Sequence, residues 1–279
     1  MTGPVVVGVD GSPSSLEAVD TAAREARLRS AELRLVHAFV WPAMHVPAEP
    51  SPLGPAQGVL REEVERVMAE AVRRARAQAP DAGLTHAVIA GEPLAVLEAQ
   101  SRRASLLVVG SRGQGRFTEV LVGSVAVHLA GHSRCPVLVM RGRPVPGGPV
   151  VVAVDGSEEG RAAVDFAFAE AALRGAGLVA VYVAADTQAG GARAEGERVL
   201  ADALSRADRP GTEVAASTRL MTGPVRQALI EESAGAQLLV VGARGLGGFT
   251  GLILGSVSQA LLHHAHCPVV VVRHRGNEG

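Results

Sequence analysis

Residues Val5–Ser12 read VVVGVDGS, and residues Val150–Ser157 read VVVAVDGS. Each stretch opens with a continuous apolar run, which is typical of a strand buried on both faces. The Asp-Gly pair then predicts a turn, and the closing serine is a favourable N-cap for a helix that follows. The chain therefore contains the same strand–turn–helix signal twice.

The rest of the chain repeats in the same order. LLVVGSRG at Leu106–Gly113 matches LLVVGARG at Leu238–Gly245, and a Gly-Ser pair follows each after nine intervening residues. A Cys-Pro-Val stretch then precedes the last apolar run of each copy. In a chain of 279 residues, each copy is long enough to form its own core. We expect a first domain at 1–141, a linker at 142–148, a second domain at 149–275, a tail at 276–279, and a Pro-rich insert around 41–57.

Short apolar runs alternate with helical periodicity in each copy, which predicts an α/β fold. In the first copy we expect strands at 5–9, 33–38, 87–90, 106–109 and 137–140. In the second copy we expect a strand starting at Val150 and others at 178–183, 214–216, 238–241 and 269–272. Five strands joined by four helices predict two tandem Rossmann-like domains. Each would have a five-stranded parallel sheet of order 3-2-1-4-5, right-handed crossovers and helices on both faces.

Composition excludes several functional classes. A formal net charge of -1 and an aromatic content of 3% argue against nucleic acid and anionic membranes as partners. All 27 basic residues are arginine, so a lysine nucleophile and a P-loop lysine are excluded. There are only two cysteines, the N-terminus does not resemble a signal peptide, and no apolar run approaches the roughly 20 residues of a membrane span. We expect a soluble cytoplasmic protein.

The chemically informative residues follow strands one and four, which flank the point where the strand order reverses. Ligands of such sheets bind there, at the carboxyl ends of the strands. Asp10 follows strand one, and Gly110 and Gly113 follow strand four, with Gly123-Ser124 at the start of a later helix. Glycines let backbone N–H groups approach an anion, and a helix N-terminus favours negative charge. The G-x2-G-x9-G-S spacing, present in both copies, predicts a polyphosphate site in each.

These motifs, with the closing CPVLV and CPVVVV strands, resemble the universal stress protein family in its tandem, ATP-binding form. The resemblance covers nearly the whole chain. It implies an adenine nucleotide alpha hydrolase-like fold that binds ATP, with Mg²⁺ held by the phosphates. Family members pair through their last strands, which implies pairing within the chain, a homodimer, or both. The implied nucleotide-binding residues are Gly8, Asp10, Ala38, Gly110, Arg112, Gly113, Gly123, Ser124 and Val125, and Ala153, Asp155, Val183, Gly242, Arg244, Gly245, Gly255, Ser256 and Val257.

Some residues have a plainer explanation than ligand chemistry. Phe117 and Phe249 are expected to pack the long loop rather than stack on adenine. The spacing of His128, His132 and Cys135 suggests a metal site, but the second copy does not preserve it, and we expect no metal site. The family often has aspartate before strand four, where this chain has Ser105 and Gln237. That position lies at the far end of the strand, so we expect no effect on binding.

The expected function is a nucleotide-gated regulatory or stress-response module with one ATP site in each domain and no assigned catalytic residue. Three alternatives remain open at this point: a slow ATPase, a dimerising adaptor that works without nucleotide, and a receptor for cAMP or AMP. The downstream protein partner is not identified by the sequence.

Overall fold

The computed structural model describes residues 3–40, 56–113, 122–184, 191–205, 214–246 and 253–274. The chain divides into two compact units, Met1–Arg116 and Phe117–Gly279. The predicted tail, most of the predicted insert, and Phe117 and Phe249 lie outside the described residues.

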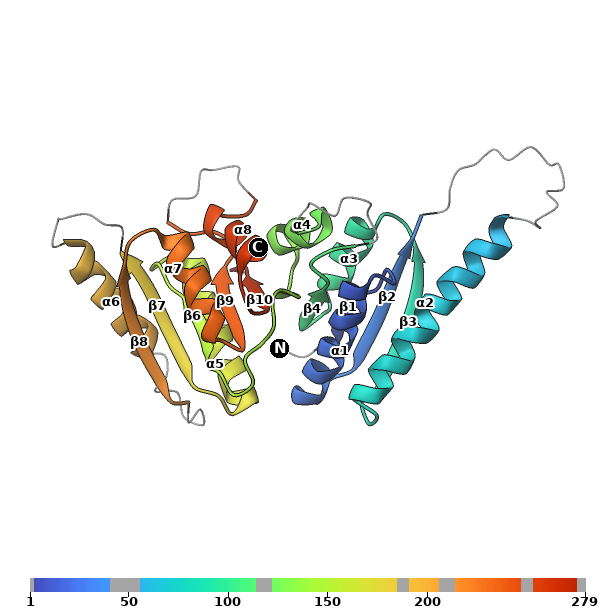
Figure 1. The fold of residues 1–279 in the computed structure, drawn as a ribbon, viewed down its shortest axis with the longest axis horizontal. Helices are drawn as coiled ribbons and strands as arrows, with labels where there is room; N and C mark the ends of the chain where they lie inside the picture. The colour runs from blue at the N-terminus through green and yellow to red at the C-terminus, as the bar shows by residue number, and fades with distance from the viewer. Residues whose placement is uncertain are drawn as a thin grey trace. The chain divides into compact units, whose positions relative to one another are not determined.

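The first unit alternates strands and helices, as the periodicity predicts. Its four strands are parallel and adjacent in the order β3-β2-β1-β4. Helix α1 packs on β1 and β4, α2 packs beside α1, and α3 packs on β1 and β2 (Figure 1). The elements are β1 (Val5–Gly8), α1 (Pro13–Leu28), β2 (Leu33–Phe39), α2 (Ala56–Gln78), β3 (Leu84–Ala90), α3 (Pro93–Ser101) and β4 (Leu106–Val109).

The second unit contains the whole second copy together with the last helix and strand of the first. Its strands are adjacent in the order β5-β10-β9-β6-β7-β8. Within the second copy, β6 to β10 are strands one to five, so the order is the predicted 3-2-1-4-5. The elements are α4 (Ser124–His132), β5 (Val137–Val139), β6 (Val150–Ala153), α5 (Glu158–Arg174), β7 (Leu178–Ala184), α6 (Gly191–Ser205), β8 (Ala216–Thr222), α7 (Val225–Glu232), a 3-10 turn (Ser233–Gly235), β9 (Leu238–Gly242), α8 (Ser256–His264) and β10 (Val269–Val272).

The central strands are covered on both faces. Every residue of β4 and of β10 is buried, although successive side chains of a strand point to opposite faces. Helices on both faces of the strands provide this cover (Figure 1). The continuous apolar runs of the sequence therefore correspond to doubly covered parallel strands, as predicted.

The last strands of the two copies pair within the chain. β10 is antiparallel to β5, with Val270 opposite Leu138, and it is parallel to β9 on its other side. All residues of both β5 and β10 are buried. Two apolar strands that would each be an exposed edge are thus paired with one another.

One strand is displaced from its predicted position. The sequence suggests a third strand of the second copy at 214–216, whereas β8 spans Ala216–Thr222. β8 pairs on one side with β7 and is largely exposed, with Ser217, Thr218 and Arg219 along it. A polar edge strand lacks the apolar run by which the other strands were located.

Candidate functional site

The turn after the first strand has the same construction in both copies. Gly11 and Gly156 have φ values of 80° and 85°, a region that favours glycine. Asp10 Oδ1 accepts a hydrogen bond of 2.9 Å from the Ser12 N–H, and in the second copy Asp155 accepts the equivalent bond at 3.0 Å. These bonds place a carboxylate at the carboxyl end of each first strand.

Each turn leads directly into a capped helix. Ser12 Oγ accepts from the Ser15 N–H at 3.2 Å, and Ser157 Oγ accepts from the Gly160 N–H at 3.0 Å. Ser12 also donates to the Arg112 carbonyl at 3.2 Å. The predicted N-caps are therefore confirmed, and in the first copy the cap also contacts the glycine loop.

The second glycine of each loop lies against the strand-end aspartate. A Cβ atom on Gly113 would stand 2.8 Å from Asp10 Oδ2, and a Cβ on Gly245 would meet Asp155 Oδ2 still more closely. Just beyond Gly245, the Leu246 N–H donates to Asp155 Oδ2 at 3.1 Å. The residues predicted to surround the phosphates are thus adjacent, and a loop N–H in the second copy binds an anionic oxygen.

The first glycine of each loop has a packing role of its own. A Cβ on Gly110 would be 2.8 Å from both the carbonyl carbon and the Oγ of Ser14, and one on Gly242 would be 3.0 Å from the carbonyl carbon of Glu159. The loop therefore passes against the first turn of α1 or α5. A side chain at either glycine would separate the loop from the helix.

The loop N–H groups meet different side chains in the two copies. In the first copy, Ser14 Oγ accepts from the Ser111 N–H at 2.8 Å and from the Arg112 N–H at 3.4 Å. In the second copy, a Glu159 carboxylate oxygen accepts from the Arg244 N–H, and the other accepts from Arg244 Nε at 2.9 Å. Glu159 was not among the predicted site residues.

The Gly-Ser pairs start helices α4 and α8, as predicted. Gly123 and Gly255 are the N-cap residues, and neither helix has a side-chain cap bond. The following serines, Ser124 and Ser256, are exposed. In the second copy the Gly255 N–H donates to the Ala243 carbonyl at 2.7 Å, which ties the helix start to the glycine loop.

The remaining predicted residues lie near the ends of the first and second strands. Gly8 ends β1, Ala153 ends β6, and Ala38 and Val183 are each the last residue but one of their strands. All four are partly exposed. In the first copy, Gly123, Ser124 and Val125 belong to the second compact unit and the other predicted residues to the first. In the second copy, all nine predicted residues lie in one unit.

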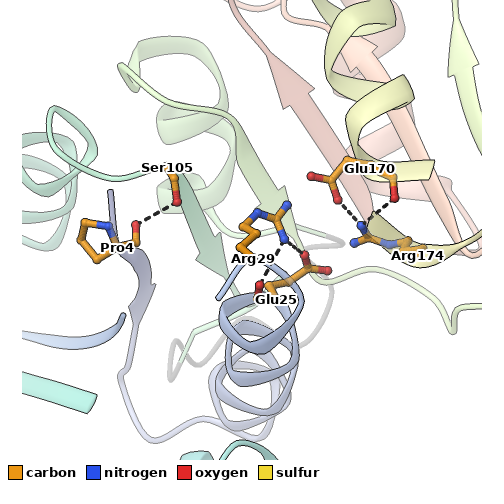
Figure 2. Close-up of polar contacts among 6 residues, drawn as sticks. All are labelled: Pro4, Glu25, Arg29, Ser105, Glu170 and Arg174. Atoms are coloured by element: carbon orange, nitrogen blue, oxygen red, sulfur yellow. Dashed lines mark hydrogen bonds and ion pairs between the residues drawn. The ribbon is translucent and has the colours of Figure 1, made fainter. Parts of the chain in front are cut away.

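The positions before the fourth strands make backbone ties at the opposite strand ends. Ser105 Oγ donates to the Pro4 carbonyl at 3.3 Å (Figure 2). The Ser105 N–H donates to the same oxygen at 2.9 Å. Gln237 Nε2 donates to the Gly148 carbonyl. These contacts hold the starts of adjacent strands together, away from the glycine loops.

The cysteine and histidine residues show no arrangement for metal binding within the described ranges. No cluster of three or more His, Cys, Asp or Glu suited to a metal ion occurs there. Cys135 and Cys267 are both buried, and burial raises the pKa of the Cys267 thiol to about 12. The His128 and His132 rings stack with their centroids 3.8 Å apart. None of the described helices is long and apolar enough to cross a membrane.

The fold and site define a tandem α/β protein that repeats a strand-end aspartate and a glycine loop. The universal stress protein family model matches residues 1–141 and 148–273. The universal stress proteins Rv2005c and Rv2623 of Mycobacterium tuberculosis are 35% and 33% identical to this chain, each alignment covering 96% of both proteins. The crystal structure of a universal stress protein from Archaeoglobus fulgidus covers 99% of this chain and 98% of its own, with a TM-score of 0.71 and 21% identity. The chain belongs to the universal stress protein family, in its tandem form.

Proposed function

We propose that this universal stress protein is a regulatory module that binds ATP, with Mg²⁺ held by the phosphates, at the glycine loops of its two copies. The observation that carries the proposal is the contact between each loop and its aspartate. Gly113 lies against Asp10 and Gly245 against Asp155, at the carboxyl ends of strands one and four. Ligands of doubly wound sheets bind in that location.

The chemistry of the loop suits phosphate oxygens. Leu246 and Arg244 already donate backbone N–H groups to carboxylates, so these donors are oriented towards anionic oxygen. The uncapped N-terminus of α8 is tied to the same loop through Gly255, and its N–H groups and dipole favour negative charge. Asp155 has the acceptor oxygens that a ribose hydroxyl or a phosphate-bound Mg²⁺ requires.

A regulatory rather than enzymatic role fits these residues. The strand-end aspartates accept backbone N–H bonds in their own turns, which fixes their positions. Nucleotide that binds the ordered loop better than other loop conformations shifts the chain towards the ordered state. The response to ATP would then be a change in loop structure that a protein partner can recognise.

The test uses the full chain purified without added nucleotide. Denaturation, chromatography and mass spectrometry would identify any adenine nucleotide that co-purifies. Calorimetric and melting titrations with Mg²⁺–ATP, ADP, AMP and cAMP would follow. Each native site should add about 2.7 kcal/mol of stability at a ligand concentration 100 times its dissociation constant. ATP should bind most tightly, because the loop and helix start offer donors to several phosphate oxygens.

Glycine variants provide the control. Gly113→Val and Gly245→Val place a side chain against Asp10 or Asp155 and should each abolish binding to one copy. Gly191→Val is the matched control, because a Cβ at Gly191 meets no atom within 4 Å and the residue lies outside the site. A nucleotide-induced melting shift that persists in the double loop variant would contradict the proposed sites. The absence of binding by all four nucleotides would favour an adaptor that works without nucleotide.

A further inference from the structure

The two glycine loops differ at one position of the following helix. Ser14 is the second residue of α1, and Glu159 is the second residue of α5. Both lie in the first turn of their helix, where Ser14 is half-buried and Glu159 is buried, and both accept a hydrogen bond from the loop backbone. The first copy therefore presents a neutral hydroxyl to its loop, and the second presents a carboxylate.

The Glu159 carboxylate occupies donors that a phosphate would use. It accepts from the Arg244 backbone N–H and binds the guanidinium through both Nε and Nη2, at 2.9 Å each. In the first copy the corresponding Arg112 N–H has only a 3.4 Å contact with Ser14 Oγ, and the Arg112 side chain is exposed. The described part of the chain contains no ion pair of Arg112.

The negative charge around the loop also differs between the two copies. A phosphate entering the second loop would approach both Asp155 and Glu159, and it would have to displace Glu159 from Arg244. A phosphate entering the first loop would approach Asp10 and the Ser14 hydroxyl. Charge-assisted hydrogen bonds are stronger than neutral ones, so the internal carboxylate is the harder group to displace.

We propose that Glu159 acts as a built-in competitor for phosphate, so that the first copy is the high-affinity nucleotide site and the second is held closed. This inference rests on the proposed function, because it assigns unequal affinities to its two sites. The position occupied by Ser14 and Glu159 is thereby the determinant of affinity in each copy. The second site fills only at high nucleotide concentration, which makes the chain a two-threshold sensor.

Reciprocal exchange of the two residues tests the inference. The full chain is titrated with Mg²⁺–ATP by calorimetry, and Gly113→Val and Gly245→Val backgrounds assign each binding event to a copy. In the wild-type chain the second copy should bind about 10- to 100-fold more weakly than the first, which corresponds to about 1.4 to 2.8 kcal/mol. Glu159→Ser should bring the second copy to within about threefold of the first, since it recreates the arrangement of Ser14. Ser14→Glu should weaken the first copy by about 10- to 100-fold.

Two further variants separate the effect of the contact between Glu159 and Arg244 from the effect of any negative charge near the loop. Glu159→Gln keeps the length of the side chain and removes its charge, and it should give part of the effect of Glu159→Ser. Glu158→Ser makes the same change one residue away, at a side chain that is 73% exposed and pairs with Arg161 rather than the loop. It should leave the ratio of the two affinities unchanged, because exposed charges are screened.

The outcomes distinguish this inference from the proposed function. Two equal sites in the wild-type chain, or equal effects of Glu158→Ser and Glu159→Ser, would overturn the role of Glu159 and leave the ATP module standing. No binding by the wild-type chain or by Glu159→Ser would overturn both. If Ser14→Glu does not fold, judged by its circular dichroism, Glu159→Ser in the Gly113→Val background decides the question alone.

Discussion

Glu170 and Arg174 form an ion pair one turn apart on α5, with side chains only 3% and 9% exposed. Glu25 on α1 and Arg29, the C-cap residue of that helix, form the equivalent pair (Figure 2). Each arginine also donates to the backbone carbonyl of its glutamate. Both copies thus bury a carboxylate and a guanidinium near the end of their first helix, where a cation also interacts favourably with the helix dipole.

Removing one member of a buried ion pair lowers the free energy of unfolding far more than removing one member of an exposed ion pair. Glu170→Gln should lower the free energy of unfolding by about 3 kcal/mol, because it takes a negative partner from a buried guanidinium. Glu195→Gln, in the exposed Glu195–Arg198 pair, is the matched control and should leave the unfolding curve almost unchanged. Urea unfolding followed by circular dichroism measures both. Equal shifts of the two midpoints would show that the buried pair contributes nothing particular.

The buried thiol of Cys267 should make the stability of the chain depend on pH in the alkaline range. Burial raises the pKa of its thiol from 9.0 to about 12. Between these values the unfolded chain loses the thiol proton and the folded chain keeps it, so the free energy of unfolding falls as pH rises from 9 to 12. The slope due to this group is at most about 1.4 kcal/mol per pH unit. Cys267→Ala should show a shallower decline in urea titrations over this range, and parallel curves would refute the assignment.

The sequence predicts the aspartates and glycines that the structure brings together, and there is a physical reason why it does not single out Glu159. The aspartates and glycines are recognisable because a strand-end turn and a loop in close contact require those residue types. Glu159 differs, since a glutamate in the first turn of a helix is ordinarily explained by the helix dipole alone. Only the alignment of the two copies, which places Glu159 opposite Ser14, marks it as unusual, and only the structure shows that its carboxylate reaches Arg244.

At the scale of elements, the pairing of β5 with β10 connects the last strands of the two copies. Val270 lies opposite Leu138 and is 0% exposed. Val270→Ala should destabilise the chain by about 2 kcal/mol, through two lost methyl groups and the cavity they leave. Val88→Ala on β3 is the matched control at 51% exposure and should cost less than about 0.5 kcal/mol. Comparable urea midpoints for the two variants would contradict tight packing at the paired strands.

Buried elements are predicted from the sequence more accurately than exposed ones. The strands at 33–38 and 106–109 were located to within a residue, because β2 and β4 have buried apolar residues in sequence. The helices starting at Ser124 and Ser256 were located at their first residue, since a Gly-Ser pair precedes an apolar periodic segment. The predicted position of β8 is wrong because its polar side chains are compatible with an edge strand but do not identify one. Sequence patterns therefore locate the centre of such a sheet better than its edges.

Across the whole chain, the repeat gives two candidate sites that share an architecture and differ in charge. Both copies have the turn, the N-cap and the glycine loop. In each copy these features are needed to lead the chain from its first strand into its first helix. The residue at the position of Ser14 and Glu159 is less restricted, since a hydroxyl and a carboxylate can both accept a hydrogen bond from the loop backbone. The two copies can therefore differ in the charge beside the glycine loop without differing in fold.

The charged groups of the glycine loops also limit catalysis. Phosphoryl transfer requires cationic groups that stabilise the transferring phosphate, and the chain contains no lysine. Arg244 occupies the right part of the second loop, but its guanidinium is bound to Glu159. We expect ATP turnover by the full chain far below the roughly 1–100 s⁻¹ typical of kinases.

Phosphate release under saturating Mg²⁺–ATP measures this turnover. The Arg112→Ala plus Arg244→Ala double variant should give the same low rate as the wild-type chain, because neither arginine is expected to act on a transferring phosphate. Glu159→Ser is an informative companion, because it releases Arg244 from its carboxylate and so tests whether a free guanidinium in the second loop raises the rate per bound nucleotide. Turnover above about 1 s⁻¹ that the double variant loses would instead make the chain an ATPase, with the arginines of its glycine loops as catalytic groups.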